Sequence, residues 1–245
     1  MSIFIDTLQG KETNRPPVWF MRQAGRISPD YRKLREQYSF QELMQNPELC
    51  AEVTLMPGRE LGVDAAILFS DILVIPQALG LEVDFPDSGP VFRNTLCESP
   101  NVTLNYNPQK LNYIYESIDC INSKKQKDFP LIGFCGGPLT TFLFMAQGSS
   151  RNHQFTDAIT FYYNNRKRAL DLLELITDAS IDYAQKQCDH GIAAFQVFET
   201  YAGILPTDVY LKDVYPQVKR LIAAVKAKGK PVIYFPKGLG TGLAH

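Results

Sequence analysis

The sequence of 245 residues has no large excess of charge of either sign and no long apolar run, and its first residues do not predict a secretory leader. Lys and Arg number 25 against 26 Asp and Glu, so no overall field draws the chain to nucleic acid or to a membrane surface. No apolar run approaches the roughly 18 residues of a membrane span. The first residues, MSIFIDTLQGKETNR, lack the basic start and apolar core of a signal peptide. We therefore expect any electrostatic recognition to be local.

Paired cysteine motifs are also missing. The five cysteines are odd in number and scattered, at Cys50, Cys97, Cys120, Cys135 and Cys188. No CxxC pair or Cys/His ligand spacing occurs among them or around His153, His190 and His245. Reduced thiols are typical of the cytoplasm. The sequence thus predicts a cytoplasmic protein without a metal site.

Five short apolar segments suggest buried strands, at residues 16–22, 64–71, 130–136, 193–199 and 231–238. Their apolar residues are nearly continuous rather than alternating, which is typical of strands covered on both faces in a parallel sheet. Stretches with helical spacing separate them. Alternating strands and helices indicate βα units, and we find no linker or repeat, so residues 1–245 are predicted to form one domain.

The strand–helix pattern alone does not separate a doubly wound sheet from a (β/α)8 TIM barrel. Polar residues end several predicted strands, namely Arg22, Asp71, Glu199 and Lys237. TIM barrels build their sites from the loops after many strands, whereas doubly wound sheets bind at one crevice. This distribution favours an α/β protein of the barrel type.

The segment RQAGR follows the first predicted strand. Arg22, Gln23 and Arg26 lie in a strand-to-helix connection. Ala24 and Gly25 beside them are small enough for a ligand to approach the backbone. Arginine grips planar carboxylates with two N–H groups. Several such side chains at one strand end indicate a polyanionic small molecule.

Three other features follow predicted strands, and each has two readings. Asp71 could stabilise a cation formed during a reaction, or could cap the next turn. The N–H groups after Gly136 and Gly137, where Pro138 opens a helix, could hold a carboxylate or could reflect helix packing. Thr200 could hydrogen-bond a ligand or cap the following segment.

At these residues the sequence resembles the uroporphyrinogen decarboxylase family of haem biosynthesis. The matching stretches keep the family's order and spacing: PVWFMRQAGR, AAILFSDILVIPQALG, GFCGGPLTTFLFMAQG and FQVFETYAG. The resemblance implies a (β/α)8 barrel, a homodimer and a carboxy-lyase that needs neither cofactor nor metal. It implies loss of CO₂ from the four acetate side chains of uroporphyrinogen III, an octacarboxylate tetrapyrrole, to give coproporphyrinogen III.

The resemblance also implies roles for individual residues. Asp71 would bind the pyrrole N–H groups and stabilise the reacting ring, while Arg22 or Arg26 would position the departing carboxylate or help to move protons. A pyrrole ring protonated on carbon is its own electron sink, which explains why no cofactor is needed. The substrate-binding residues implied by the family are Arg22, Gln23, Ala24, Gly25, Arg26, Arg35, Asp71, Phe134, Phe144, Phe198 and Thr200.

The sequence departs from the family pattern in two ways. Phe144 stands where the family has a cleft tyrosine, which would remove a hydrogen bond of about 1 kcal/mol. We also predict about five strands where the family has eight, so the barrel is expected to be truncated at its C-terminus by roughly a hundred residues, judging from the usual size of βα units. His245 does not match, by position, the substrate-binding histidine of the family's C-terminal part.

An open sheet edge and an exposed core favour aggregation. We therefore expect the isolated chain to be poorly stable or to aggregate. A reversible, cooperative thermal unfolding transition, followed by circular dichroism, would contradict this expectation.

Two alternative functions remain at this point. One is a non-catalytic or truncated tetrapyrrole-binding remnant, which would bind porphyrinogen without releasing CO₂; the short chain and Phe144 favour it. The other is a cobamide-dependent methyltransferase of the same superfamily, whose zinc site contains a His-x-Cys motif. No His-x-Cys occurs in this sequence, and the RQAGR segment favours the decarboxylase.

Overall fold

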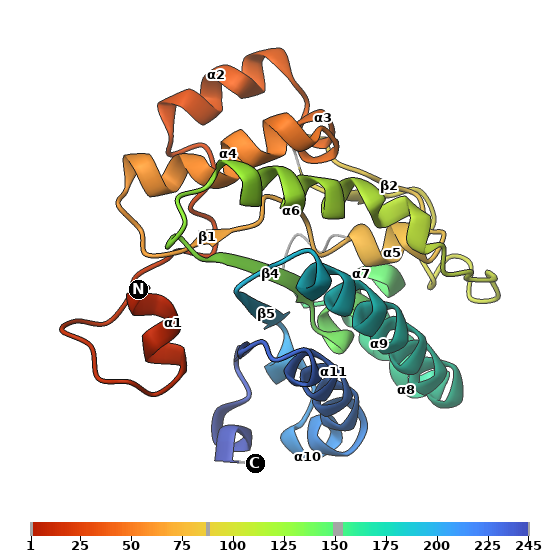
Figure 1. The fold of residues 1–245 in the computed structure, drawn as a ribbon. Helices are drawn as coiled ribbons and strands as arrows, with labels where there is room; N and C mark the ends of the chain where they lie inside the picture. The colour runs from red at the N-terminus through yellow and green to blue at the C-terminus, as the bar shows by residue number, and fades with distance from the viewer. Residues whose placement is uncertain (1, 87–88, 149–153, 245) are drawn as a thin grey trace.

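Parallel strands alternate with helices in this protein, which confirms the predicted α/β class (Figure 1). The computed structural model describes residues 2–86, 89–148 and 154–244, so His153 and His245 lie outside the described residues. The main sheet has the order β1-β4-β5-β6. Its strands are β1 (Ala66–Ile67), β4 (Leu131–Gly136), β5 (Ala194–Glu199) and β6 (Val232–Pro236), and a separate antiparallel pair is formed by β2 (Val83–Asp84) and β3 (Val91–Phe92).

Helices surround the sheet. α4 and α6 pack against each other beside β1, and the long α9 packs against both β4 and α11 (Figure 1). The helices are α1 (Ile3–Leu8), α2 (Pro29–Gln37), α3 (Phe40–Gln45), α4 (Pro47–Glu60), α5 (Val74–Ala78), α6 (Asn112–Lys124), α7 (Pro138–Gln147), α8 (Thr156–Asn164), α9 (Arg166–Asp189), α10 (Thr207–Val209) and α11 (Tyr215–Ala227). Shorter turns are η1 (Pro108–Leu111), η2 (Ala202–Ile204), η3 (Tyr210–Val214) and η4 (Gly240–Ala244).

The strands of the main sheet end at one common edge. Gly136 of β4 pairs with Phe198 of β5, and Glu199 pairs with Pro236 of β6. Every residue of β4 and β5 is buried, as their continuous apolar runs predict. Residues that follow these strands are therefore brought together, which is the arrangement expected of a barrel-type site.

The predicted strand over residues 16–22 is wrong, because residues 16–20 have no regular secondary structure and residues 21–22 form a turn. Pro16 and Pro17 have no N–H group to donate to a neighbouring strand. The apolar residues that suggested burial are instead exposed: Val18 by 44%, Phe20 by 54% and Met21 by 42%. Four of the five predicted strands are present, and the one predicted over 64–71 is reduced to β1.

Two local signals place the helices next to the site. Ser28 caps α2 as predicted, since its hydroxyl accepts a hydrogen bond from the Tyr31 N–H at 3.1 Å, with Pro29 in the first turn. Ser39 and Glu42 form a capping box at the start of α3. These caps fix where the chain enters each helix, and thereby the position of Tyr31 and Phe40 at the common strand edge.

Gln187 of α9 fixes the strand that carries Phe134. β1 pairs with β4 only as far as Ile132, so the next backbone groups of β4 on that side lack a strand partner. The Gln187 side chain donates to the Phe134 carbonyl at 3.1 Å and accepts from the Phe134 N–H at 3.2 Å. A Cβ at the neighbouring Gly133 would come within 2.4 Å of Gln187 Oε1, so glycine is needed there.

Candidate active site

A cleft of about 630 Å³ lies at the carboxyl ends of β1, β4 and β5. It is lined by Met21, Arg22, Ala24, Gly25, Arg26, Ile27, Tyr31, Phe40, Ile67, Leu68, Phe69, Ser70, Asp71, Ile72, Pro90, Phe134, Phe198 and Thr200. Eight of the residues predicted from the sequence are among them: Arg22, Ala24, Gly25, Arg26, Asp71, Phe134, Phe198 and Thr200. The structure therefore brings together side chains from four separate stretches of the chain.

Three of the predicted residues lie elsewhere. Gln23 is 2% exposed; its side chain donates to the Ala65 carbonyl at 3.0 Å and accepts from the Phe20 N–H at 3.1 Å, so it fixes the arginine segment to the chain before β1. Arg35 donates to the Tyr38 carbonyl at 2.7 Å at the end of α2.

Phe144 is half-buried in an aromatic cluster beside the cleft. Its ring packs edge-on against Phe155, with centroids 5.3 Å apart, and against Tyr201, with centroids 6.0 Å apart. Tyr201 follows the cleft residue Thr200 directly. Burial raises the pKa of the Tyr201 phenol, and the nearby charge of Arg22 lowers it by less. Phe144 thus lies behind the lining residues.

The cleft combines apolar walls with cationic and acidic groups. Phe134 and Phe198 contact each other edge-on with centroids 5.5 Å apart, and Phe40 contacts Phe69 at 5.1 Å. Arg22 and Arg26 are exposed at the opening. A ligand with an apolar body and anionic substituents would satisfy both kinds of surface.

Asp71 shows both features that the sequence left open. Its Oδ1 accepts a hydrogen bond from the Leu73 N–H at 2.8 Å, so it caps the following turn. It also lines the cleft. Burial raises the pKa of Asp71, and the Leu73 hydrogen bond and the Arg22 charge lower it by less. The Arg22 guanidinium therefore offsets part of the desolvation cost that burial imposes on the ionised Asp71.

The start of α7 holds a carboxylate of the protein itself. Glu199 accepts hydrogen bonds from the N–H groups of Leu139 at 3.2 Å and Thr140 at 2.6 Å. The reading of this helix start as a ligand site is therefore wrong, because its free N–H groups are already satisfied. The sequence signal for this contact was Glu199 itself, an acidic residue at the end of the buried apolar run AAFQVFE.

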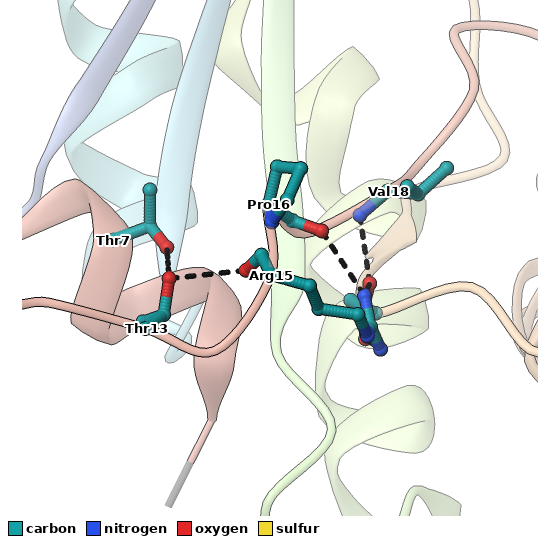
Figure 2. A network of polar contacts seen from close by, with 6 residues as sticks. Thr7, Thr13, Arg15, Pro16 and Val18 are labelled. Carbon is teal, nitrogen blue, oxygen red and sulfur yellow. Dashed lines mark hydrogen bonds and ion pairs between the residues drawn. The ribbon is translucent and has the colours of Figure 1, made fainter.

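Asp64 anchors the segment that carries the arginines, and sequence analysis missed it. Both terminal nitrogens of Arg15, which Figure 2 shows beside Val18, donate to the Asp64 carboxylate, each at 2.7 Å. The Val18 N–H donates to the same carboxylate at 2.7 Å, and the Asp64 N–H donates to the Val18 carbonyl at 2.8 Å. Arg15 lowers the pKa of Asp64 through this hydrogen-bonded pair. An isolated Asp before an apolar run gives no sequence sign of a partner 49 residues away.

Asp64→Ala is expected to loosen this anchor without touching the cleft. The Val18 amide should exchange its hydrogen about fivefold faster, because a hydrogen bond of about 1 kcal/mol is lost there. Hydrogen exchange followed by mass spectrometry would measure this, with Asp30→Ala as a control, since Asp30 pairs with the exposed Lys33 within α2. Unchanged exchange at Val18 would show that the segment is held by other contacts.

Few of the remaining features offer chemistry. In the described part of the chain no group of three or more His, Cys, Asp and Glu is placed to hold a metal ion. No helix there is long and apolar enough to cross a membrane. A second groove of about 560 Å³ beside β2 and β3 contains Arg93 already paired with Glu82 and Asp84.

Comparisons with known proteins point in one direction. A family model described as Uroporphyrinogen decarboxylase (URO-D) matches residues 1–245. A uroporphyrinogen decarboxylase of Christiangramia forsetii is 38% identical over 96% of this chain and 70% of its own length. One of Helicobacter acinonychis is 40% identical over 98% of this chain and 73% of its own length.

A solved structure of a methyltransferase from Methanosarcina mazei superposes with a TM-score of 0.72 at 18% identity. The superposed region covers 95% of this chain and 69% of the methyltransferase chain. At this identity the likeness shows a shared fold and carries no statement on activity.

Proposed function

Because the chain belongs to the uroporphyrinogen decarboxylase family, we propose that its cleft removes CO₂ from the four acetate side chains of uroporphyrinogen III and yields coproporphyrinogen III. The observation that carries the proposal is the placement of Asp71 in one cleft with Arg22 and Arg26. The substrate has eight carboxylates on an apolar macrocycle. The carboxylates match the arginines at the opening of the cleft, and the macrocycle matches its aromatic walls.

The chemistry takes up one proton from solvent for each CO₂ released and otherwise needs only the chain and the substrate. A pyrrole carbon takes up a proton, which makes the ring cationic. The bond to the acetate carboxylate then breaks, CO₂ leaves, and its bonding electrons neutralise the ring. A proton adds to the exocyclic carbon and the first proton leaves the ring, so a methyl group replaces each acetate. Asp71 is proposed to stabilise the cationic ring, and Arg22 or Arg26 to position the carboxylate.

We propose roles for the other lining residues on the same basis. Ala24 and Gly25 would let the substrate approach the backbone, Phe134 and Phe198 would contact the ring, and Thr200 would hydrogen-bond it. Gln23 would act indirectly, through the bonds that hold the arginine segment.

The proposal extends to a homodimer in the cytoplasm. Phe20, Met21 and Ile27 are exposed by 54%, 42% and 72% beside the cleft, and contact with a second copy would cover them. All five cysteines are free thiols, which suits a reducing compartment.

Turnover of uroporphyrinogen III by the purified 245-residue chain tests the proposed function. The substrate is kept reduced, and products are oxidised and separated by their number of carboxylates. A product with four carboxylates is expected. Binding of the porphyrinogen without CO₂ release would contradict the proposal and support the non-catalytic, tetrapyrrole-binding alternative.

A further inference from the structure

Glu199 is a fully buried carboxylate at the edge of the cleft that the proposed reaction does not use. It lies on β5 between Phe198 and Thr200, both of which line the cleft. Because side chains alternate along a strand, Glu199 points away from the cleft and toward α7. Phe198 of β5 and Thr200, in the turn just after the strand, therefore line the cleft, while the charge of Glu199 is buried on the other side.

Thr140 contacts the residues on both sides of Thr200, namely Glu199 and Tyr201. Glu199 Oε1 accepts from the Thr140 N–H at 2.6 Å and from the Thr140 hydroxyl at 2.5 Å. The same hydroxyl oxygen accepts from the Tyr201 N–H at 3.3 Å. The residue before Thr200 and the residue after it are therefore both tied to Thr140.

The surroundings leave room only for this arrangement. A Cβ at Gly137 would lie 2.4 Å from Glu199 Oε2, so glycine is required where the helix start meets the carboxylate. On the other side, the Glu199 carbonyl accepts from the Lys237 N–H at 3.1 Å, which ties the end of β5 to the end of β6.

We propose that Glu199 and Thr140 are positioning residues, which fix Thr200 in the cleft by holding the residues on both sides of it to the first turn of α7. This inference rests on the proposed function, since it assigns a purpose to the place of Thr200 in the decarboxylase cleft. Neither residue lines the cleft.

The proton state of Glu199 couples this arrangement to pH. The three groups that bond the carboxylate are arranged to donate, so the ionised form satisfies them best. Burial raises the pKa of Glu199 to about 7 against the effect of these bonds. The other titratable groups facing it are Tyr210 of η3, Tyr234 of β6 and Cys135 of β4, each with a pKa raised by burial so that it stays neutral.

The sign of the pH effect follows from that shift. An ordinary glutamate has a pKa near 4.5, so the folded chain holds a proton that the unfolded chain has lost between about pH 4.5 and pH 7. Stability from this group is therefore lost as pH rises through that window. The positioning of Thr200 changes in the opposite sense, because it improves as the carboxylate ionises near pH 7.

A double-mutant cycle tests the inference. Thr140→Val keeps the shape of the side chain but removes the hydroxyl, and we expect about a fivefold fall in kcat/KM through a higher KM. Combined with Thr200→Ala, it should cause little further loss, because a residue that positions Thr200 has no effect once that hydroxyl is gone. Thr140→Ser should restore most of the activity. Glu116 lies on the exposed face of α6, so Glu116→Gln is the matched control for Glu199→Gln.

Additive losses in the Thr140→Val and Thr200→Ala pair would overturn the inference while leaving the proposed decarboxylation intact. A second readout does not depend on turnover. The amide resonance of Thr200 should shift with pH around a midpoint near 7 in the wild-type chain and not in Glu199→Gln. The same titration in both proteins would overturn the inference whether or not the chain decarboxylates uroporphyrinogen.

Discussion

Asp71→Asn is expected to lower kcat for uroporphyrinogen decarboxylation by at least about 100-fold, the loss typical of removing a group that stabilises charge in the transition state. The substitution keeps an oxygen that can accept the Leu73 N–H, so the turn after β1 should persist. It removes only the negative charge beside the reacting ring. Single-turnover measurement of CO₂ release would separate this effect from a change in binding.

The matched control is Asp208→Asn, since Asp208 is exposed on α10 and does not line the cleft. It should leave kcat unchanged. If Asp71→Asn retained more than a tenth of the wild-type kcat, the negative charge of Asp71 would not be the stabilising group, and the proposed mechanism would be wrong.

Arg22→Gln is expected to lower kcat/KM by about 10- to 100-fold, because a charge-assisted hydrogen bond to a substrate carboxylate contributes about 1.5–3 kcal/mol. It should also move the acidic limb of the pH–rate profile to higher pH. Arg22 lowers the pKa of Asp71, so its removal lets burial raise that pKa further, and more alkaline solution is then needed to ionise Asp71.

Arg22→Lys separates the two effects. Lysine keeps the positive charge, so the acidic limb of the pH–rate profile should stay near its wild-type position. Loss of the bidentate hydrogen bond to the substrate carboxylate should still raise KM. Arg59→Gln, exposed on α4 away from the cleft, is the control. An acidic limb that does not move in Arg22→Gln would show that the two side chains do not interact in the working enzyme.

The strands and the cleft could be predicted because their sequence signals are local. Continuous apolar runs gave β4 and β5 within a residue of their observed ends. Once parallel strands are assumed, residues after different strands must meet at one edge, so Asp71 and Thr200 could be placed together from the sequence. Arg22 was placed with them by way of a strand that does not form.

The contacts that hold these residues in place could not be predicted. Gln23 looks like a ligand group in RQAGR, yet its amide is used by the backbone of Ala65 and Phe20. Glu199 satisfies a helix start that the sequence left open to a ligand. Both cases depend on which polar groups meet after the chain has folded, and residue type and spacing carry no record of such meetings.

The one strand that was predicted wrongly, over residues 16–22, has apolar side chains that are exposed. Val18 and Phe20 have the β propensity of a buried strand, but the two prolines before them cannot donate to a ladder. The segment is held instead by the Asp64 carboxylate, whose partner Arg15 precedes the prolines (Figure 2). Apolar composition predicted burial here without the hydrogen bonds that make a strand.

In the proposed function, the tetrapyrrole binds at the carboxyl ends of β1, β4 and β5. Amide hydrogen exchange with and without coproporphyrinogen III, kept reduced under argon, tests this most directly, because it locates the ligand without requiring turnover. Exchange should slow in residues 20–27, 67–73 and 198–201 and stay unchanged in residues 81–84 and 110–113 of the second groove. Slower exchange confined to residues 81–84 and 110–113, or none in residues 20–27, would contradict this binding site.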